Sequence, residues 1–331
     1  MHTLFKSLAL LLPVAAGVAR PVSAQTVLFQ EQFDTPSRWS TVTKSPANVA
    51  RYKGTDWLQY PPLGNIAPTS FNLLYTEWGN APVQMSGDGA EGKFLRLKLS
   101  TYNPNNFKPN TARKYLWGTE LQTLRKFGPP TPGHAIDFEA RLRLPVSAPQ
   151  MISSFYTYSQ RLNAGTVYSD EVDFEYLGSN TGKEVQVVTW NDWARRNDTE
   201  NIPGQGYYDG SHHWATLTGS GQANSNPVNP AQWHLLKIRW ICVSSGVYRI
   251  EFYSKQNAAL PYTVLYGENG VRPNEGMEVH LNIWATNPTP APTSAPGTNY
   301  LMDVDWCRVS DVTLSAAELR KAKSSVSSGR S

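Results

Sequence analysis

The segment "SDEVDFEYLG", residues 169–178, places three acidic side chains at alternate positions, Glu171, Asp173 and Glu175. Side chains of a strand project to alternate faces, so residues two apart share a face. The segment therefore predicts a strand with three carboxyls on one face and apolar Val172, Phe174 and Tyr176 on the other. Three neighbouring carboxylates repel one another, so some of their pKa values must rise and one group can stay protonated.

That asymmetry is what retaining glycoside hydrolysis requires. One ionised carboxylate attacks the anomeric carbon, and a second, protonated carboxyl about 5–5.5 Å away donates to the leaving oxygen. Residues i and i+4 lie roughly 13 Å apart along a strand, so Glu171 and Glu175 can act together only if their side chains lean inward over a curved strand. A calcium site of oxygen ligands and the solvated acidic face of an edge strand are the alternatives.

The first 24 residues have the pattern of a secretory signal peptide. Lys6 precedes the apolar run "SLALLLPVAAGVA", and Val22 and Ala24 supply the small residues that a signal peptidase reads. We expect cleavage after Ala24 and a secreted, extracellular protein. The apolar run is short and interrupted by Pro and Gly, and no later stretch approaches about 18 apolar residues, so a membrane partner is not expected.

The charge distribution gives no indication of a nucleic-acid partner. The whole chain carries a formal charge of +4, which loss of Lys6 and Arg20 lowers to +2. The tail 315–331 has four basic residues and one acidic residue, and we expect it to be a flexible, solvated end. The rest is therefore close to neutral and has no basic stripe.

The chain has 2 cysteines, Cys242 and Cys307. An even number of cysteines in a secreted chain favours a disulfide, and two buried thiols on adjacent strands are the alternative. Their spacing fits no zinc pattern.

Strand-like segments separated by Gly, Pro and Asn recur along the chain. "FLRLKLS" and "AIDFEARLRL" alternate cleanly between apolar and polar residues, as half-buried antiparallel strands do. "SAAELRKAK" near the end is the one convincing helical pattern. The absence of βαβ alternation predicts an all-β antiparallel sandwich, a jelly roll, with a single domain at residues 25–314. The 11 Trp, 16 Tyr and 11 Phe suit both a β core and aromatic platforms for sugars.

The acidic segment "DEVDFEYLG" has the pattern E-x-D-x-E. In this segment the chain resembles glycoside hydrolase family 16, the group of laminarinases, lichenases, agarases and xyloglucan transglycosylases, whose signature has that pattern. The segments "WGTEL", "FEARLRLP", "SSFYTYS", "HLNIWA" and "MDVDWCRV" follow in family order. The resemblance runs from about Val27 to Val309, and the uninterrupted signature is similar to that of the lichenase and transglycosylase branch.

The resemblance implies a jelly roll whose concave face forms a sugar-binding cleft, and it assigns roles by position. Glu171 is implied as nucleophile, Asp173 as its assisting acid and Glu175 as general acid/base. Glu120 is implied as a sugar contact and Asp305 as a ligand of a structural Ca²⁺. The remaining expected substrate-binding residues are aromatic: Tyr158 and Trp284 by family position, and Trp190 and Trp193 by their place on or just after the next strand.

The expected function is a secreted, retaining endo-β-glycan hydrolase that acts on β-1,3/1,4- or β-1,3-glucan and needs no organic cofactor. Its partner is then a polysaccharide, and we expect a monomer. Within the same chemistry, a transglycosylase would pass the glycosyl unit to a sugar acceptor instead of water. A non-catalytic lectin is the alternative from another class. A polysaccharide lyase would need a Tyr/His or Lys/Arg cluster that the sequence does not offer.

Overall fold

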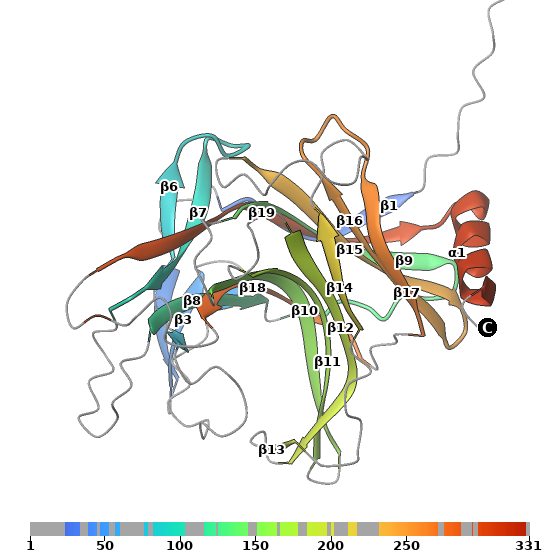
Figure 1. Ribbon diagram of the computed structural model, residues 1–331, viewed down its shortest axis with the longest axis horizontal. Helices are drawn as coiled ribbons and strands as arrows, with labels where there is room; N and C mark the ends of the chain where they lie inside the picture. The colour runs from blue at the N-terminus through green and yellow to red at the C-terminus, as the bar shows by residue number, and fades with distance from the viewer. Residues whose placement is uncertain are drawn as a thin grey trace, which may run out of the picture.

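The computed structural model describes residues 24–33, 39–44, 47–52, 57–59, 76–78, 82–102, 116–123, 125–144, 151–163, 166–177, 184–196, 200–201, 211–216, 232–270, 275–285, 293 and 297–328. These residues form two packed β-sheets and one helix (Figure 1). The predicted antiparallel jelly-roll sandwich is confirmed. No helix within the described ranges is long and apolar enough to cross a membrane.

The first sheet, sheet A, is built around the long strand β19 (Asn299–Thr313). One side of β19 pairs with β9, and the other side pairs first with β7 and then with β1. The other members of sheet A are β1 (Gln25–Glu31), β6 (Val83–Ser86), β7 (Lys93–Ser100), β9 (His134–Arg143), β15 (His234–Ser244), β16 (Val247–Lys255) and β17 (Thr263–Asn269). The pairing order from β19 is β9, β15, β16 and β17.

The second sheet, sheet B, carries the acidic segment. Its strands follow the order β2 (Trp39–Lys44), β3 (Ala47–Tyr52), β4 (Trp57–Gln59), β8 (Leu116–Thr123), β18 (Glu278–Ala285), β10 (Met151–Asn163), β11 (Thr166–Leu177), β12 (Glu184–Arg196) and β14 (Ser211–Thr216). Two short strands are attached to it, β13 (Glu200–Asn201) to β12 and β5 (Thr76–Trp78) in parallel to β8. In Figure 1, β10, β11 and β12 curve together, and the inside of the curve faces away from sheet A.

The hydrophobic core lies between the two sheets because both sheets alternate apolar and polar residues. Leu95, Leu97 and Leu99 of β7 are fully buried, and Val172 and Phe174 of β11 meet them from sheet B in the same cluster. Burying a side chain of this size contributes about 1.5–3 kcal/mol relative to leaving it exposed. The core therefore fixes which face of β11 turns outward, and that face carries the three carboxyls.

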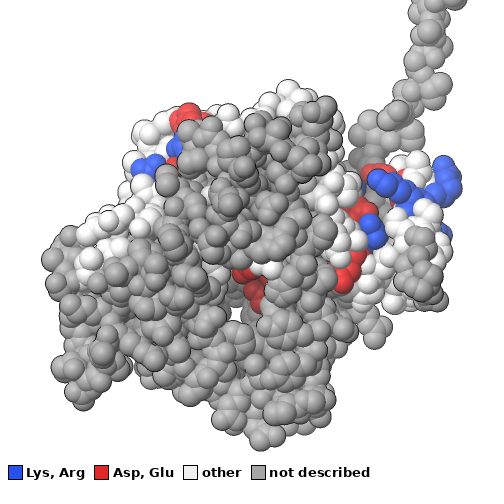
Figure 2. All heavy atoms as spheres, viewed as in Figure 1, with Lys and Arg blue, Asp and Glu red and all other residues white. Residues whose placement is uncertain are grey.

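The end of the chain differs from the expected flexible tail. Helix α1 (Ala316–Ser328) forms there, at the end of the molecule where basic side chains gather in Figure 2. Its first turn is a capping box, in which Ser315 Oγ accepts from the Glu318 backbone N–H at 3.3 Å and Glu318 Oε2 accepts from Ser315 N–H at 2.8 Å. Ala322 is 3% exposed and packs on Ile241 and Val243. The cap and this small apolar contact therefore stabilise the helix that the pattern "SAAELRKAK" predicts and hold it against sheet A.

The predicted disulfide is wrong, because both cysteines are buried free thiols. They lie on β15 and β19, which are separated by β9 rather than adjacent. Cys307 pairs with Ala140, whereas Ile241, the neighbour of Cys242, pairs with Ala135. Positions 135 and 140 are about 16 Å apart along a strand, and a disulfide joins Cα atoms at most about 7 Å apart.

Candidate active site

Strand β11 presents its three acidic residues on the face opposite the core, as the alternation predicts. Val172 and Phe174 are 0% and 1% exposed within the core, whereas Glu171 and Glu175 are partly accessible. Asp173, between them, is only 2% exposed. The face that carries these residues is called the carboxyl face below. In Figure 2, acidic atoms are visible in a hollow near the middle of the face in view.

The neighbouring strands place a polar residue on each side of Glu175. Glu175 lies between Ser154 of β10 and Gln186 of β12. Because paired residues of adjacent strands share a face, these side chains belong to the carboxyl face, and Ser154 and Gln186 are 3% and 9% exposed. The acidic segment therefore lies in the interior of sheet B, not on an edge strand, and the edge-strand alternative is wrong.

Glu171 and Glu175 differ in protonation because their surroundings raise the pKa of Glu175. Burial, followed by repulsion from the Glu171 carboxylate, raises the pKa of Glu175 from 4.5 to about 8. Glu175 therefore holds its proton at neutral pH next to the negative charge of Glu171. Such a pair can supply both a proton donor and an anionic nucleophile.

Glu120, another carboxyl of the same face, is held by side chains of two neighbouring strands. Glu120 of β8 is 6% exposed, and its Oε1 accepts a hydrogen bond from Tyr156 Oη at 2.8 Å. His280 Nδ1 lies 3.0 Å from the same oxygen. The rings of Tyr156 and His280 stack with centroids 4.5 Å apart, and Tyr158 meets His280 edge-on at 5.7 Å. The predicted sugar contacts Glu120 and Tyr158 are thus joined in one cluster.

The other predicted aromatic contacts lie on strands that flank this cluster. Trp284 of β18 is partly accessible and pairs with Ile152 of β10. Trp190 pairs with Glu171, and Trp193 pairs with Ser169, because the register between β11 and β12 shifts between these pairs. The side chains of Trp190 and Trp193 are outside the described part of the structure. Positions 190 and 193 are three residues apart, so strict alternation would put them on opposite faces of β12. The bulge in this pairing nevertheless places position 190 opposite Glu171 and position 193 opposite Ser169.

Sequence reasoning missed several residues of this face. Those that the register places on it are Ser154, Tyr156, Gln186, Glu278, His280 and Asn282. Each lies an even number of positions from a predicted residue on its strand, or opposite one on the next strand. Alternation from Tyr158 and Trp284 would have identified five of them, but Gln186 needed the pairing with β11.

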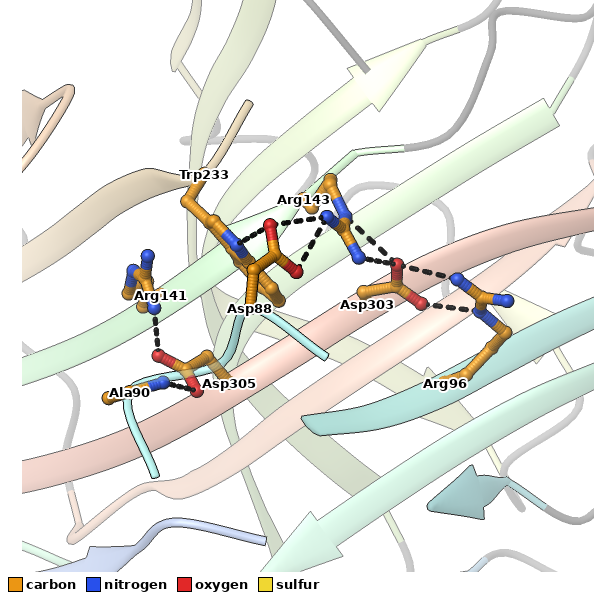
Figure 3. Close-up of polar contacts among 8 residues, drawn as sticks. All are labelled: Asp88, Ala90, Arg96, Arg141, Arg143, Trp233, Asp303 and Asp305. Carbon is orange, nitrogen blue, oxygen red and sulfur yellow. Dashed lines mark hydrogen bonds and ion pairs between the residues drawn. The ribbon is translucent and has the colours of Figure 1, made fainter. Parts of the chain in front are cut away.

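Asp305, the predicted calcium ligand, lies in an ion-pair network on the outer face of sheet A (Figure 3). It is 1% exposed, its Oδ2 accepts from Arg141, and its Oδ1 accepts the Ala90 backbone N–H at 2.7 Å. Nearby, Asp303 binds the guanidinium groups of Arg96 and Arg143. Within the described ranges no group of three or more His, Cys, Asp or Glu side chains could hold a metal. Because the Arg141 guanidinium already neutralises Asp305, these residues do not fit a cation, and the network instead fastens the turn at residues 87–92 to the sheet.

The solved structures with a similar fold include β-glucanases. The chain matches the catalytic domain of an endo-1,3-β-glucanase (laminarinase) from Thermotoga petrophila with a TM-score of 0.52 and 13% identity, covering 87% of this chain and 98% of that one. It matches an endo-1,3-β-glucanase from Streptomyces sioyaensis with a TM-score of 0.50 and 16% identity, covering 89% and 99%. A β-1,3-1,4-glucanase (lichenase) from a mouse hindgut metagenome gives a TM-score of 0.48 and 18% identity, covering 85% and 97%. A scan of family models and a search of curated proteins gave no match. At these identities the likeness shows the fold.

Proposed function

We propose that this protein is a retaining endo-β-glycan hydrolase of glycoside hydrolase family 16. The observation that carries the proposal is geometric: Glu171 and Glu175 lie on the same outward face of β11, four positions apart. Burial and the neighbouring Glu171 carboxylate raise the pKa of Glu175 to about 8, which favours its role as the proton donor of the pair. The glucanase-like jelly roll and the five family segments of the sequence support the proposal.

The chemistry follows from the protonation states. Glu171 attacks the anomeric carbon and forms a glycosyl ester, while Glu175 gives its proton to the leaving oxygen. Glu175, now a carboxylate, then takes a proton from a water molecule, whose oxygen attacks the anomeric carbon and releases Glu171. Asp173, buried between the two, assists Glu171. This scheme requires no metal or organic cofactor.

The proposed substrate is a neutral β-glucan with β-1,3/1,4 or β-1,3 linkages. The described part of the carboxyl face carries five acidic residues, namely Glu120, Glu171, Asp173, Glu175 and Glu278. A concentration of negative potential on one face disfavours an anionic polysaccharide. Aromatic rings such as Tyr158 and Trp284 suit the apolar faces of pyranose rings. We also propose secretion by the N-terminal signal, with β-glucan met outside the cell.

The test is digestion of a panel of β-glycans by the wild-type protein, Glu171→Gln and Glu175→Ala. We expect products that retain the β-configuration by NMR of the early reaction, oligosaccharides of mixed length by mass spectrometry, and no turnover by Glu171→Gln. Glu175→Ala should lose about 10²–10⁴-fold in rate on natural glycans and least on activated aryl glycosides, with rescue by azide.

Three results would change the assignment. Inverted products would exclude Glu171 as nucleophile. Longer products after an acceptor oligosaccharide is added would identify a transglycosylase. If the wild-type protein cleaves no glycan and both it and Glu171→Gln bind oligosaccharides equally, the protein is a lectin.

A further inference from the structure

The cluster of Glu120, Tyr156 and His280 lies on the same sheet as the proposed catalytic pair but contains neither member of it. All three residues are buried, at 6%, 9% and 2% exposure, and they come from three neighbouring strands, β8, β10 and β18. A buried carboxylate is expensive unless donors replace its water. Here two donors, the Tyr156 hydroxyl and the His280 ring, lie 2.8 and 3.0 Å from one oxygen of Glu120.

Both contacts involve Oε1 of Glu120 and neither uses Oε2. A carboxylate oxygen fixed by two donors cannot rotate freely, so the orientation of the second oxygen is fixed as well. The stacking of Tyr156 on His280, with centroids 4.5 Å apart and planes 28° apart, further restrains both donors. The cluster therefore presents one carboxylate oxygen in a defined direction, where it can accept a sugar hydroxyl.

The register locates this oxygen relative to the reacting groups. Glu120 pairs with Asn282, Asn282 with Ser154, and Ser154 with Glu175, in a line across four strands. Strands are spaced about 4.8 Å apart, so the backbone positions of Glu120 and Glu175 are about 14 Å apart. A sugar unit bound at Glu120 is therefore not the unit whose bond is cleaved.

We propose that Tyr156 and His280 are positioning residues that hold Glu120 as the hydrogen-bond acceptor for a hydroxyl of a glucosyl unit remote from the scissile bond. The proposal rests on the proposed glucanase function. It adds which residues bind the polysaccharide at a sugar unit away from the cleaved bond. Binding energy from a remote unit that is equal in the ground and transition states changes KM and leaves kcat unchanged. Loss of either donor should have that kinetic signature.

The experiment uses two variants with matched controls whose partners, Glu139 and Asp311, belong to sheet A. Tyr156→Phe removes the hydroxyl and keeps the ring, and its control is Tyr262→Phe, since Tyr262 Oη donates to the buried Glu139 at 2.9 Å. His280→Leu removes the donor, and its control is His134→Leu, since His134 Nδ1 lies 2.8 Å from Asp311. His280→Asn is the conservative variant, because the Asn amide nitrogen can take the place of Nδ1.

We measure kcat and KM on a soluble β-glucan, the Tm of each variant, and oligosaccharide binding by calorimetry in a Glu171→Gln background. Tyr156→Phe and His280→Leu should raise KM and Kd by about tenfold, the size expected for a weakened hydrogen bond to a charged group, with kcat within about twofold. His280→Asn should recover most of the affinity, and the controls should leave KM unchanged even where they lower Tm.

The inference is overturned if KM rises no more in Tyr156→Phe and His280→Leu than in the controls, or if kcat falls while KM is unchanged. In both cases hydrolysis by the wild-type protein still stands, so the proposed function survives. If the wild-type protein cleaves no β-glucan, the proposed function fails. The binding data in the Glu171→Gln background then decide separately whether Glu120 contacts a sugar.

Discussion

The charge of Glu171 should be measurable as a change in the pKa of Glu175 in the variant Glu171→Gln. The amide has nearly the shape of the carboxylate but no charge, so it removes one of the two causes that raise the pKa of Glu175 from 4.5 to about 8. Each pK unit corresponds to about 1.4 kcal/mol, so the protonated form of Glu175 is favoured by about 5 kcal/mol in total. Burial is the larger cause and persists, so we expect a pKa that falls below 8 but stays above 4.5.

The assay is titration of the side-chain carboxyl carbons by NMR on protein labelled at Glu, in the wild type and in Glu171→Gln. The wild-type value should also appear as the basic limb of the pH profile of kcat/KM, since activity is lost when Glu175 gives up its proton. Glu278→Gln is the matched control, because Glu278 shares the carboxyl face but does not contribute to the pKa of Glu175. A Glu175 pKa near 4.5 in the wild type, or an equal pKa in Glu171→Gln, would refute the reasoning.

Three further predictions concern stability, measured by denaturant unfolding. Because the folded-state pKa of Glu175 lies above its unfolded value, the folded protein binds the extra proton, and stability falls as pH rises from about 4.5 to about 8. Glu175→Gln should therefore be more stable than the wild type by a few kcal/mol at pH 9 but not at pH 4, and an equal difference at both pH values would contradict this. Glu318→Ala removes the capping box of α1 and should cost about 1 kcal/mol, with Lys321→Ala as an unaffected control. Arg141→Met leaves the buried Asp305 without its cation and should cost about 3–5 kcal/mol, and a change below 1 kcal/mol would show that Asp305 is neutralised otherwise.

Much of the fold followed from local alternation in the sequence. "KFLRLKLS" became β7 with Leu95, Leu97 and Leu99 in the core, and "HAIDFEARLR" became β9. Such segments are predictable because burial of one face of a strand requires an apolar residue at every second position. The C-terminal helix was visible in the pattern, but its docking depends on Ile241 and Val243, which are far away in the sequence.

The disulfide could not be decided from composition, because an even number of cysteines says nothing about where the strands place them. Cys242 and Cys307 lie on strands separated by β9, at positions too far apart to bond. The predicted metal ligand Asp305 illustrates the same limit. A single acidic residue has the right chemistry for calcium, and only the cross-strand neighbour Arg141 shows what neutralises it.

By itself, the sequence determined the strand that bears Glu171, Asp173 and Glu175 and the direction in which that strand faces, because both follow from side-chain periodicity within ten residues. Only the tertiary structure decided what stands beside these groups. The register brings Tyr156 and His280 to Glu120, and a bulge pairs position 190 with Glu171 and position 193 with Ser169. The tertiary structure also decides the pKa of Glu175, because that pKa depends on burial by several strands as well as on the neighbouring Glu171. Alternation is a property of one strand, whereas pairing, burial and electrostatic environment are properties of the folded chain.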